Sequence, residues 1–199
     1  MVQTVDNPTT SPAVEQRFTC RGLTWHQFQA IQASFEDVPG VRLFDCEGVL
    51  EIVGISKPHE AVQSIIAGLL LLYNFEVKEV EFFPSGSYSQ IIEGVVEYQS
   101  DLSYCFGTDK DVPDLCIEVV IISGSPIKLQ KYRLMGVPEV WFWEDGTLQL
   151  YRLREQGYEP IASSELLPEL DLSLLKRCIL FASPLEALKE FRKGISSND

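Results

Sequence analysis

The sequence predicts an α/β domain in which helices flank a mixed β-sheet. Three observations predict this class: helical and extended hydrophobic periods alternate along the chain, its 199 residues suffice for one domain, and 45% of them are hydrophobic. Residues 1–16 are polar and rich in Thr, Ser and Pro, so we expect a disordered N-terminal arm there. Residues 17–195 are expected to form one domain.

The first half of the domain contains two expected helices with a strand between them. A capping-box pattern at Thr24 precedes apolar residues at helical spacing, which predicts a helix over residues 25–35. The apolar residues of 48–53 predict a strand. Pro58 suits a first helical position, and the broad apolar face that continues to Tyr73 indicates a second helix that is mostly core.

Extended periods dominate the middle of the chain. From Phe75 the period changes from helical to extended, so we expect one strand over 75–83 and another over 95–106. Residues 114–122 hold a short apolar run rich in β-branched residues, typical of a central strand that is buried on both faces. A serine-proline start and a glycine C-cap predict a helix over 125–136.

The last part of the domain begins with an expected hairpin. Strands over 139–143 and 148–153 are joined by Asp145-Gly146, a typical tight-turn sequence. Ser183-Pro184 combines a cap residue with a proline start and predicts a final helix that ends near Gly194 and packs on the domain.

Charge and composition restrict the function. The formal net charge is −13, whereas proteins that contact many phosphates usually present a basic face. The longest apolar run, 65–72, is far below the ~20 residues of a spanning helix, so no membrane segment is expected. Five cysteines without C-x-x-C spacing argue against a disulfide framework and a thiolate zinc site, which favours a reduced, cytoplasmic protein. Phosphate-loop, dinucleotide and serine-hydrolase motifs are absent.

Glu118 is the most informative residue. It is the only charged residue between Asp114 and Lys128, in the middle of an apolar strand, and a buried carboxylate without a partner costs several kcal/mol. We therefore expect a partner for it. The alternative is a carboxylate that reaches solvent or an arginine.

Two further residues are candidate companions. Asp101 lies on the polar phase of the 95–106 strand, and two carboxylates on neighbouring strands would form a hard-oxygen site for Mg²⁺ or Mn²⁺. Lys128, in the first turn of the helix after Glu118, opposes the helix dipole unless an anion lies nearby. Taken alone, Asp101 could belong to a solvated strand face and Lys128 could be an exposed surface residue. His59 could orient a substrate or a carboxylate, and Glu51 could lie on a sheet face.

Six segments of the sequence, taken in order, are similar to a known family. The segments are Glu47–Ile52, Pro58–Glu60, Asp101–Tyr104, Pro113–Val119, Lys128–Tyr132 and Gly136–Trp141. They resemble the family of restriction-type endonucleases in the PD-(D/E)xK nuclease superfamily, over about residues 20–175.

The resemblance implies a restriction-endonuclease-like core in which Asp101 and Glu118 bind a divalent metal from two adjacent strands. The lysine of the superfamily usually follows the glutamate by two residues, where this chain has Val120. The family resemblance maps the lysine to Lys128 on the following helix, as K-x-x-x-Y with Tyr132.

We therefore expect a Mg²⁺- or Mn²⁺-dependent endonuclease that hydrolyses DNA phosphodiester bonds and acts as a possible homodimer. Asp101, Glu118 and the carbonyl of Val119 would hold the metal, Lys128 would orient water or neutralise charge, and His59 and Glu51 would support the ligands. A basic strip of Lys128, Lys131 and Arg133, extended by Arg152 and Arg154, would contact the backbone. The alternative is a non-catalytic interaction or regulatory protein that keeps the nuclease scaffold, which the charge and Val120 favour.

Overall fold

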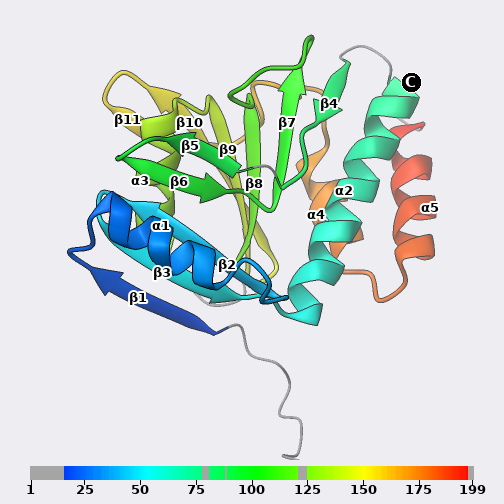
Figure 1. Ribbon diagram of the computed structural model, residues 1–199. Coiled ribbons are helices and arrows are strands. Elements are labelled where there is room, and N and C mark those ends of the chain that lie inside the picture. Colours follow the sequence, from blue (N-terminus) through cyan, green and yellow to red (C-terminus); the bar gives the residue numbers. More distant parts are fainter. Residues whose placement is uncertain (1–15, 78–80, 88, 121–124, 197–199) are drawn as a thin grey trace, which may run out of the picture.

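The computed structural model describes residues 16–77, 81–87, 89–120 and 125–196, which form two β-sheets and five helices (Figure 1). The five-stranded sheet has the order β1 (Arg17–Arg21), β3 (Val49–Gly54), β2 (Val41–Cys46), β6 (Val96–Gln99), β5 (Ser89–Ile92). The six-stranded sheet has the order β11 (Gly157–Ile161), β10 (Thr147–Arg154), β9 (Glu139–Glu144), β8 (Leu115–Val120), β7 (Leu102–Phe106), β4 (Phe82–Pro84). Only β8 and β9 pair in parallel among these strands, so the second sheet is mixed as expected.

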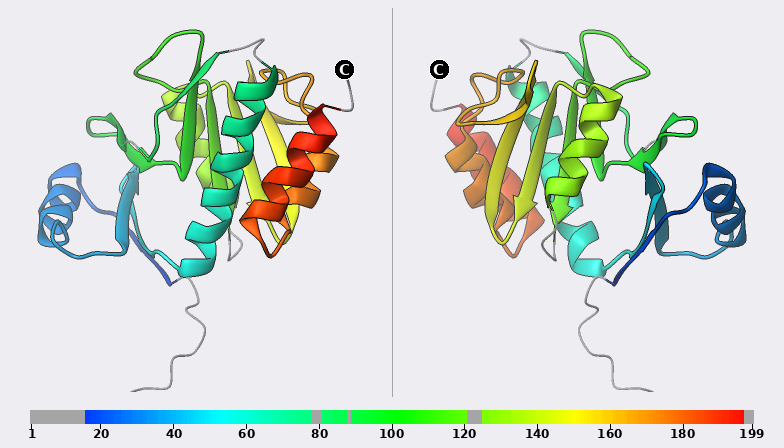
Figure 2. Two further views of the ribbon diagram at one scale, coloured as in Figure 1. Left: turned by 90° about the vertical axis from the view of Figure 1, so that its right-hand side faces the viewer. Right: turned by 90° about the vertical axis from the view of Figure 1, so that its left-hand side faces the viewer.

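The helices lie in separate layers (Figures 1 and 2). One face of the six-stranded sheet is covered by α2 (Lys57–Val77), α4 (Leu172–Ile179) and α5 (Pro184–Ile195). Its other face meets α3 (Ser125–Met135) and the five-stranded sheet, whose outer face carries α1 (Trp25–Ser34). These layers agree with the predicted α/β class of helices flanking a mixed sheet.

The central strand β8 separates two hydrophobic cores. Ile117 and Val119 face the core beneath α2, α4 and α5, whereas Cys116 and Val120 face the core that contains Tyr132 of α3. All six residues of β8 are buried, as its apolar run predicts. Glu118 shares its strand phase with Cys116 and Val120, so its side chain projects between the two sheets.

Several expected elements are confirmed with small shifts at their ends. The capping box at Thr24 is present, and α2 has a proline at its second residue. Asp145 and Gly146 both have positive φ, 49° and 74°, as the tight turn between β9 and β10 requires. Ser183 caps α5 by accepting a hydrogen bond from the backbone N–H of Glu186. Residues 121–122 of the expected central strand and residues 1–15 of the expected arm lie outside the described residues; Gln16 accepts a hydrogen bond from Gly54 of β3.

Two predicted strands are wrong. Residues 75–77 continue α2, so the strand expected over 75–83 shrinks to β4, because α2 packs against α5 and Arg192 of α5 pairs with Glu76. The strand expected over 95–106 is two strands, β6 and β7, that belong to different sheets. The break falls at Ser100 and Asp101, where the chain passes from one sheet to the other.

Other elements were not predicted from the sequence. Strands β1, β2, β5 and β11 and the helix α4 were missed. The strands β1 and β5 are edge strands with partly exposed residues, so their hydrophobic alternation is weak. The five cysteines are all free.

In the part of the chain that the structure describes, α2 is the one helix long and apolar enough to cross a membrane, with a mean hydropathy of 1.2. This rests on length and composition only, and the core helix of a soluble protein passes the same test. The inner face of α2 packs in the larger core through Ile66, Leu69, Leu70 and Tyr73.

Candidate active site

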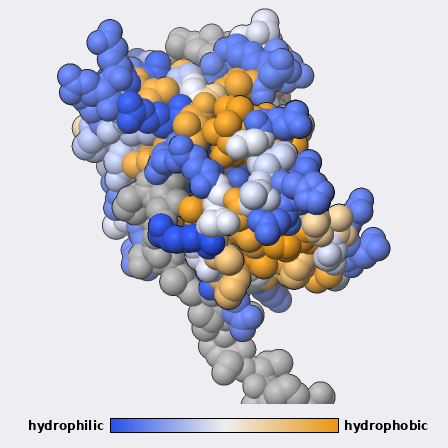
Figure 3. All heavy atoms as spheres, turned by 60° about the vertical axis from the view of Figure 1, so that its left-hand side comes forward, coloured by the Kyte–Doolittle hydropathy of each residue, from blue (hydrophilic) through white to orange (hydrophobic). Residues whose placement is uncertain are grey.

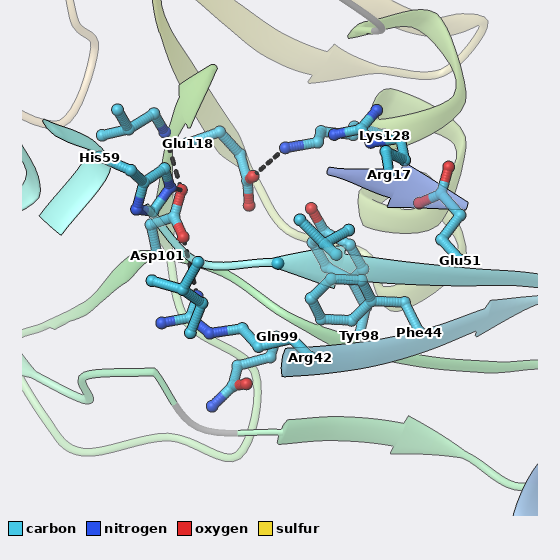
Figure 4. Close-up of a pocket in the computed structure, with 14 residues that line it drawn as sticks. Arg17, Arg42, Phe44, Glu51, His59, Tyr98, Gln99, Asp101, Glu118 and Lys128 are labelled. Carbon is cyan, nitrogen blue, oxygen red and sulfur yellow. Dashed lines mark hydrogen bonds and ion pairs between the residues drawn. The ribbon is translucent and has the colours of Figure 1, made fainter. Parts of the chain in front are cut away.

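A pocket lies between the two sheets and receives polar side chains from seven elements or their ends (Figure 4). The carboxylates of Asp101 and Glu118, both predicted from the sequence, line this one pocket together with Lys128. The break between β6 and β7 supplies Asp101, β8 supplies Glu118 and α3 supplies Lys128. The remaining titratable lining residues are Arg17, Arg42, Glu51, His59 and Tyr98.

Glu118 is buried at 2% exposure and has partners on both carboxylate oxygens. Lys128 Nζ donates to Oε2 at 2.5 Å, and the hydroxyl of Tyr132 donates to Oε1. Both donors come from α3, one turn apart, so this helix gives Glu118 the partners that a buried carboxylate requires. Burial, together with the Asp101 carboxylate, nevertheless raises the pKa of Glu118 against the lowering effect of Lys128.

Asp101 is held by four neighbours. Its Oδ2 accepts the backbone N–H of Val119 at 2.8 Å and lies 3.0 Å from His59 Nε2, while Oδ1 accepts from Arg42 Nη1 at 2.8 Å. Gln63, one turn after His59 on α2, donates to the backbone carbonyl of Asp101. Burial acts to raise the pKa of Asp101, but the hydrogen bond and charge of His59 lower it below the ordinary value.

The sequence placed Asp101 inside a strand, and the structure places it at the end of one. Because Asp101 lies where the chain passes from one sheet to the other, its carboxylate accepts from a residue of each sheet, Arg42 of β2 and the N–H of Val119 of β8. The bond to Val119 joins the chain before β7 to the C-terminal end of β8 and sets Asp101 beside Glu118.

His59 lies between two carboxylates. Its Nε2 faces Asp101, and its Nδ1 lies 3.2 Å from Glu60 Oε1. The ring is buried at 7% exposure in the first turn of α2. The ring therefore contacts the Asp101 carboxylate, as the expected role of His59 in orienting a carboxylate requires.

Glu51 and Lys131 form a second buried pair beside the first. Lys131 is completely buried, and its Nζ donates to Glu51 Oε2 at 2.5 Å. The same ammonium lies 4.6 Å from the ring centroid of Tyr98 and 5.4 Å from that of Phe44. Tyr98 in turn meets the ring of Tyr132 edge-on at 5.2 Å, so the second pair is packed against the group that holds Glu118.

The basic strip expected from the sequence does not form. Lys131 points inward to Glu51, and Arg152 and Arg154 pair with glutamates of the six-stranded sheet and the loop after it. Figure 3 shows the side of the molecule on which α1 and α3 lie, where hydrophobic and hydrophilic patches alternate without a continuous hydrophilic band. A lysine at helical spacing from Lys128 cannot be assigned to the surface from sequence alone when its partner is 80 residues away.

Two arginines of the site, Arg17 and Arg42, were not predicted from the sequence. Arg42 spans Asp101 and Glu60, at 2.8 and 3.9 Å. Arg17 exerts an electrostatic influence on both Glu51 and Lys128. Both arginines lie on strands that were not predicted. The alternation of polar and apolar residues within Arg17–Arg21 is the one signal in the sequence that could have indicated Arg17.

The donor set of the pocket fits a magnesium-type ion that keeps waters and substrate oxygens in its shell. Carboxylates and carbonyls are hard ligands, and Mg²⁺ is commonly held by one or two carboxylates plus phosphate and water. The two facing acids match that pattern, although within the described ranges no group of three or more His, Cys, Asp or Glu could form an all-protein cage. A metal on Glu118 would compete with the ammonium of Lys128.

A mixed sheet with an acid at the end of one strand, an acid in the adjacent central strand and a lysine beside them defines the class of PD-(D/E)xK nuclease-like proteins. A family model described as "Uma2: Putative restriction endonuclease" matches residues 25–179, and the chain belongs to this family, which is part of that superfamily. No curated protein matches the chain.

Proposed function

We propose that the protein is a metal-dependent endonuclease that hydrolyses DNA phosphodiester bonds in the pocket between its two sheets. One observation carries the proposal: Asp101 and Glu118 come from separate segments and converge in one buried pocket, with Lys128 on Glu118. Membership of the restriction endonuclease family supports a nuclease with a DNA substrate.

The residues have distinct roles in this proposal. Asp101, Glu118 and the main-chain carbonyl of Val119 would hold Mg²⁺ or Mn²⁺. When bound, such an ion polarises a phosphate and lowers the pKa of water. His59 and Arg42 hold the Asp101 carboxylate in one orientation, and Tyr132 does the same for Glu118.

Lys128 supplies a positive charge in this proposal. Its side chain is buried beside Glu118, and its ammonium would neutralise negative charge that develops on the phosphate as water adds to phosphorus and the bond to the leaving oxygen breaks. An ammonium on a flexible stem can serve one site from several backbone positions, which supports Lys128 in place of a lysine at position 120.

A second candidate is a non-catalytic protein that keeps the nuclease scaffold. Two observations favour it: position 120 is a buried valine, and every carboxylate oxygen of Asp101 and Glu118 already has a protein donor. A metal would have to replace some of these contacts.

A cleavage assay separates the two candidates. Supercoiled plasmid and linear DNA are incubated with Mg²⁺, with Mn²⁺ or with EDTA, using the wild type, Glu118→Gln and the control Glu186→Gln on the exposed face of α5. We expect cleavage only with metal, a loss of at least about 10²-fold for Glu118→Gln, and no change for the control. Mn²⁺ should also bind Glu118→Gln more weakly.

Equal Mn²⁺ affinity in wild type and Glu118→Gln would contradict the metal site. Absence of cleavage on either DNA, with either metal, would favour the scaffold protein.

A further inference from the structure

The edge strand β1 presents polar residues on the same face as the pocket. Arg17 pairs with Val53 and Thr19 with Glu51 in the antiparallel register, and all of these except Thr19 line the pocket. Directly opposed residues of an antiparallel pair share one face of the sheet. Arg17, Thr19 and Arg21 therefore form one row that starts in the pocket and runs along the outer edge of the five-stranded sheet.

This row is open to solvent. Thr19 and Arg21 are exposed, and the side chain of Arg21 has no hydrogen bond or ion pair with the described residues. Among the described strands, β1 pairs only with β3, so its outer backbone N–H groups also face away from the sheet. Arg17 brings a further positive charge to the inner end of the row, beside Lys128, whereas Arg42 lies on the other side of the pocket and pairs with Asp101 (Figure 4).

From this arrangement, and resting on the proposed function, we infer that β1 is a track for the phosphodiester backbone of DNA that leads into the pocket. Arg21, Thr19 and Arg17 contact phosphates of one DNA strand in turn and guide that strand to Lys128. Arginine, threonine and backbone N–H groups are the donors that commonly position DNA by its phosphates.

The dimensions of the row agree with such a track. A strand rises about 3.4 Å per residue, so Arg17 and Arg21 are about 14 Å apart along β1. One DNA strand carries a phosphate about every 3.4 Å along the duplex axis, so side chains about 6.8 Å apart on one face of β1 match every second phosphate.

The net charge of −13 does not prevent DNA from approaching this row. The acids nearest its inner end are neutralised within the protein, Glu118 by Lys128, Glu51 by Lys131 and Asp101 by Arg42. Negative charge elsewhere on the chain repels DNA from other faces and leaves this row as the favourable approach.

Binding in EDTA tests the track without any cleavage. A fluorescent single strand and the corresponding duplex are titrated with full-length protein while salt is varied between about 50 and 200 mM. Each phosphate contact makes the negative slope of log K against log salt steeper by about 0.7 to 0.9. The ratio of the affinity at the low salt concentration to that at the high one therefore falls about threefold for each contact that is lost.

Two matched pairs of variants separate the track from general charge. Arg21→Gln removes one charge from the row, and Arg177→Gln removes one charge from the exposed surface of α4. Thr19→Lys adds a charge to the row, whereas Phe18→Lys adds it to the neighbouring residue on the opposite face, which is 60% exposed. We expect Arg21→Gln to lower the slope by about one contact and Thr19→Lys to raise it by as much, with no such change in the two controls.

Equal effects within either pair, or absence of wild-type binding to both probes at low salt, would overturn the track. Tighter binding of one of the two probes shows whether the row accepts single-stranded or double-stranded DNA. If the variants change the slopes as expected but the protein does not cleave DNA, the proposed catalysis is rejected and the track is kept. If the protein cleaves DNA but the variants leave the slopes unchanged, the track is rejected and the proposed catalysis is kept.

Discussion

Replacing Lys131 with methionine should destabilise the protein more than the loss of any surface ion pair. The change keeps most of the side-chain volume but leaves Glu51, whose side chain is 5% exposed, without its ammonium partner. Breaking a buried pair by removing one member costs about 3–5 kcal/mol. In a domain of this size, each kcal/mol lowers the melting temperature by about 2–4 °C, so we expect a fall of about 6–20 °C.

The loss should depend on pH in a defined direction. Burial acts to raise the pKa of Glu51, but the adjacent Lys131 lowers it below the ordinary value of 4.5. A carboxyl group with a lowered folded pKa contributes stability above its unfolded pKa, and this contribution disappears as the pH falls through the folded pKa. The difference between wild type and Lys131→Met should therefore narrow as the pH falls through and below 4.5.

Urea unfolding followed by the fluorescence of the buried residues Trp141 and Trp143 measures the effect. Lys189→Met is the control, because its partner Glu186 is exposed and such pairs contribute about 0–1 kcal/mol. The double variant Glu51→Gln/Lys131→Met should recover part of the stability. The assigned pairing energy is wrong if Lys131→Met lowers the free energy of unfolding no more than Lys189→Met does. It is also wrong if the losses from Glu51→Gln and Lys131→Met simply add in the double variant.

Three further changes follow from the same contacts. Lys128→Ala should reduce plasmid cleavage by about 10²-fold or more. It should also lower the free energy of unfolding in urea, because Glu118 loses a buried partner, whereas a change in an exposed lysine would not. Tyr132→Phe removes one hydrogen bond to Glu118 while keeping the ring, so the free energy of unfolding should fall by about 1.5–3 kcal/mol in urea. Glu139→Gln disturbs a completely buried carboxylate that accepts from Trp141 and Ser164, and a loss below about 1 kcal/mol would show that these bonds are not formed.

The sequence by itself determined the elements whose signals are local. The caps at Thr24 and Ser183, the turn at Asp145 and Gly146, and the apolar run of β8 each depend on neighbours within a few residues. The isolation of Glu118 in an apolar strand also predicted that it has a partner, and Lys128 is ten residues away on the following helix. The resemblance to the nuclease family supplied the order of these parts.

Only the tertiary structure decided how distant segments meet. The division of residues 95–106 between two sheets depends on pairing with β2 and β8, and it moves Asp101 from a strand face to a break. Lys131 carries the same local signal as an exposed helical lysine, yet Glu51 lies 80 residues earlier in the chain and packing brings the two together. The position of β1 beside the pocket is likewise set by its register with β3, since hydrogen bonds between distant strands leave little trace in the alternation of a short edge strand.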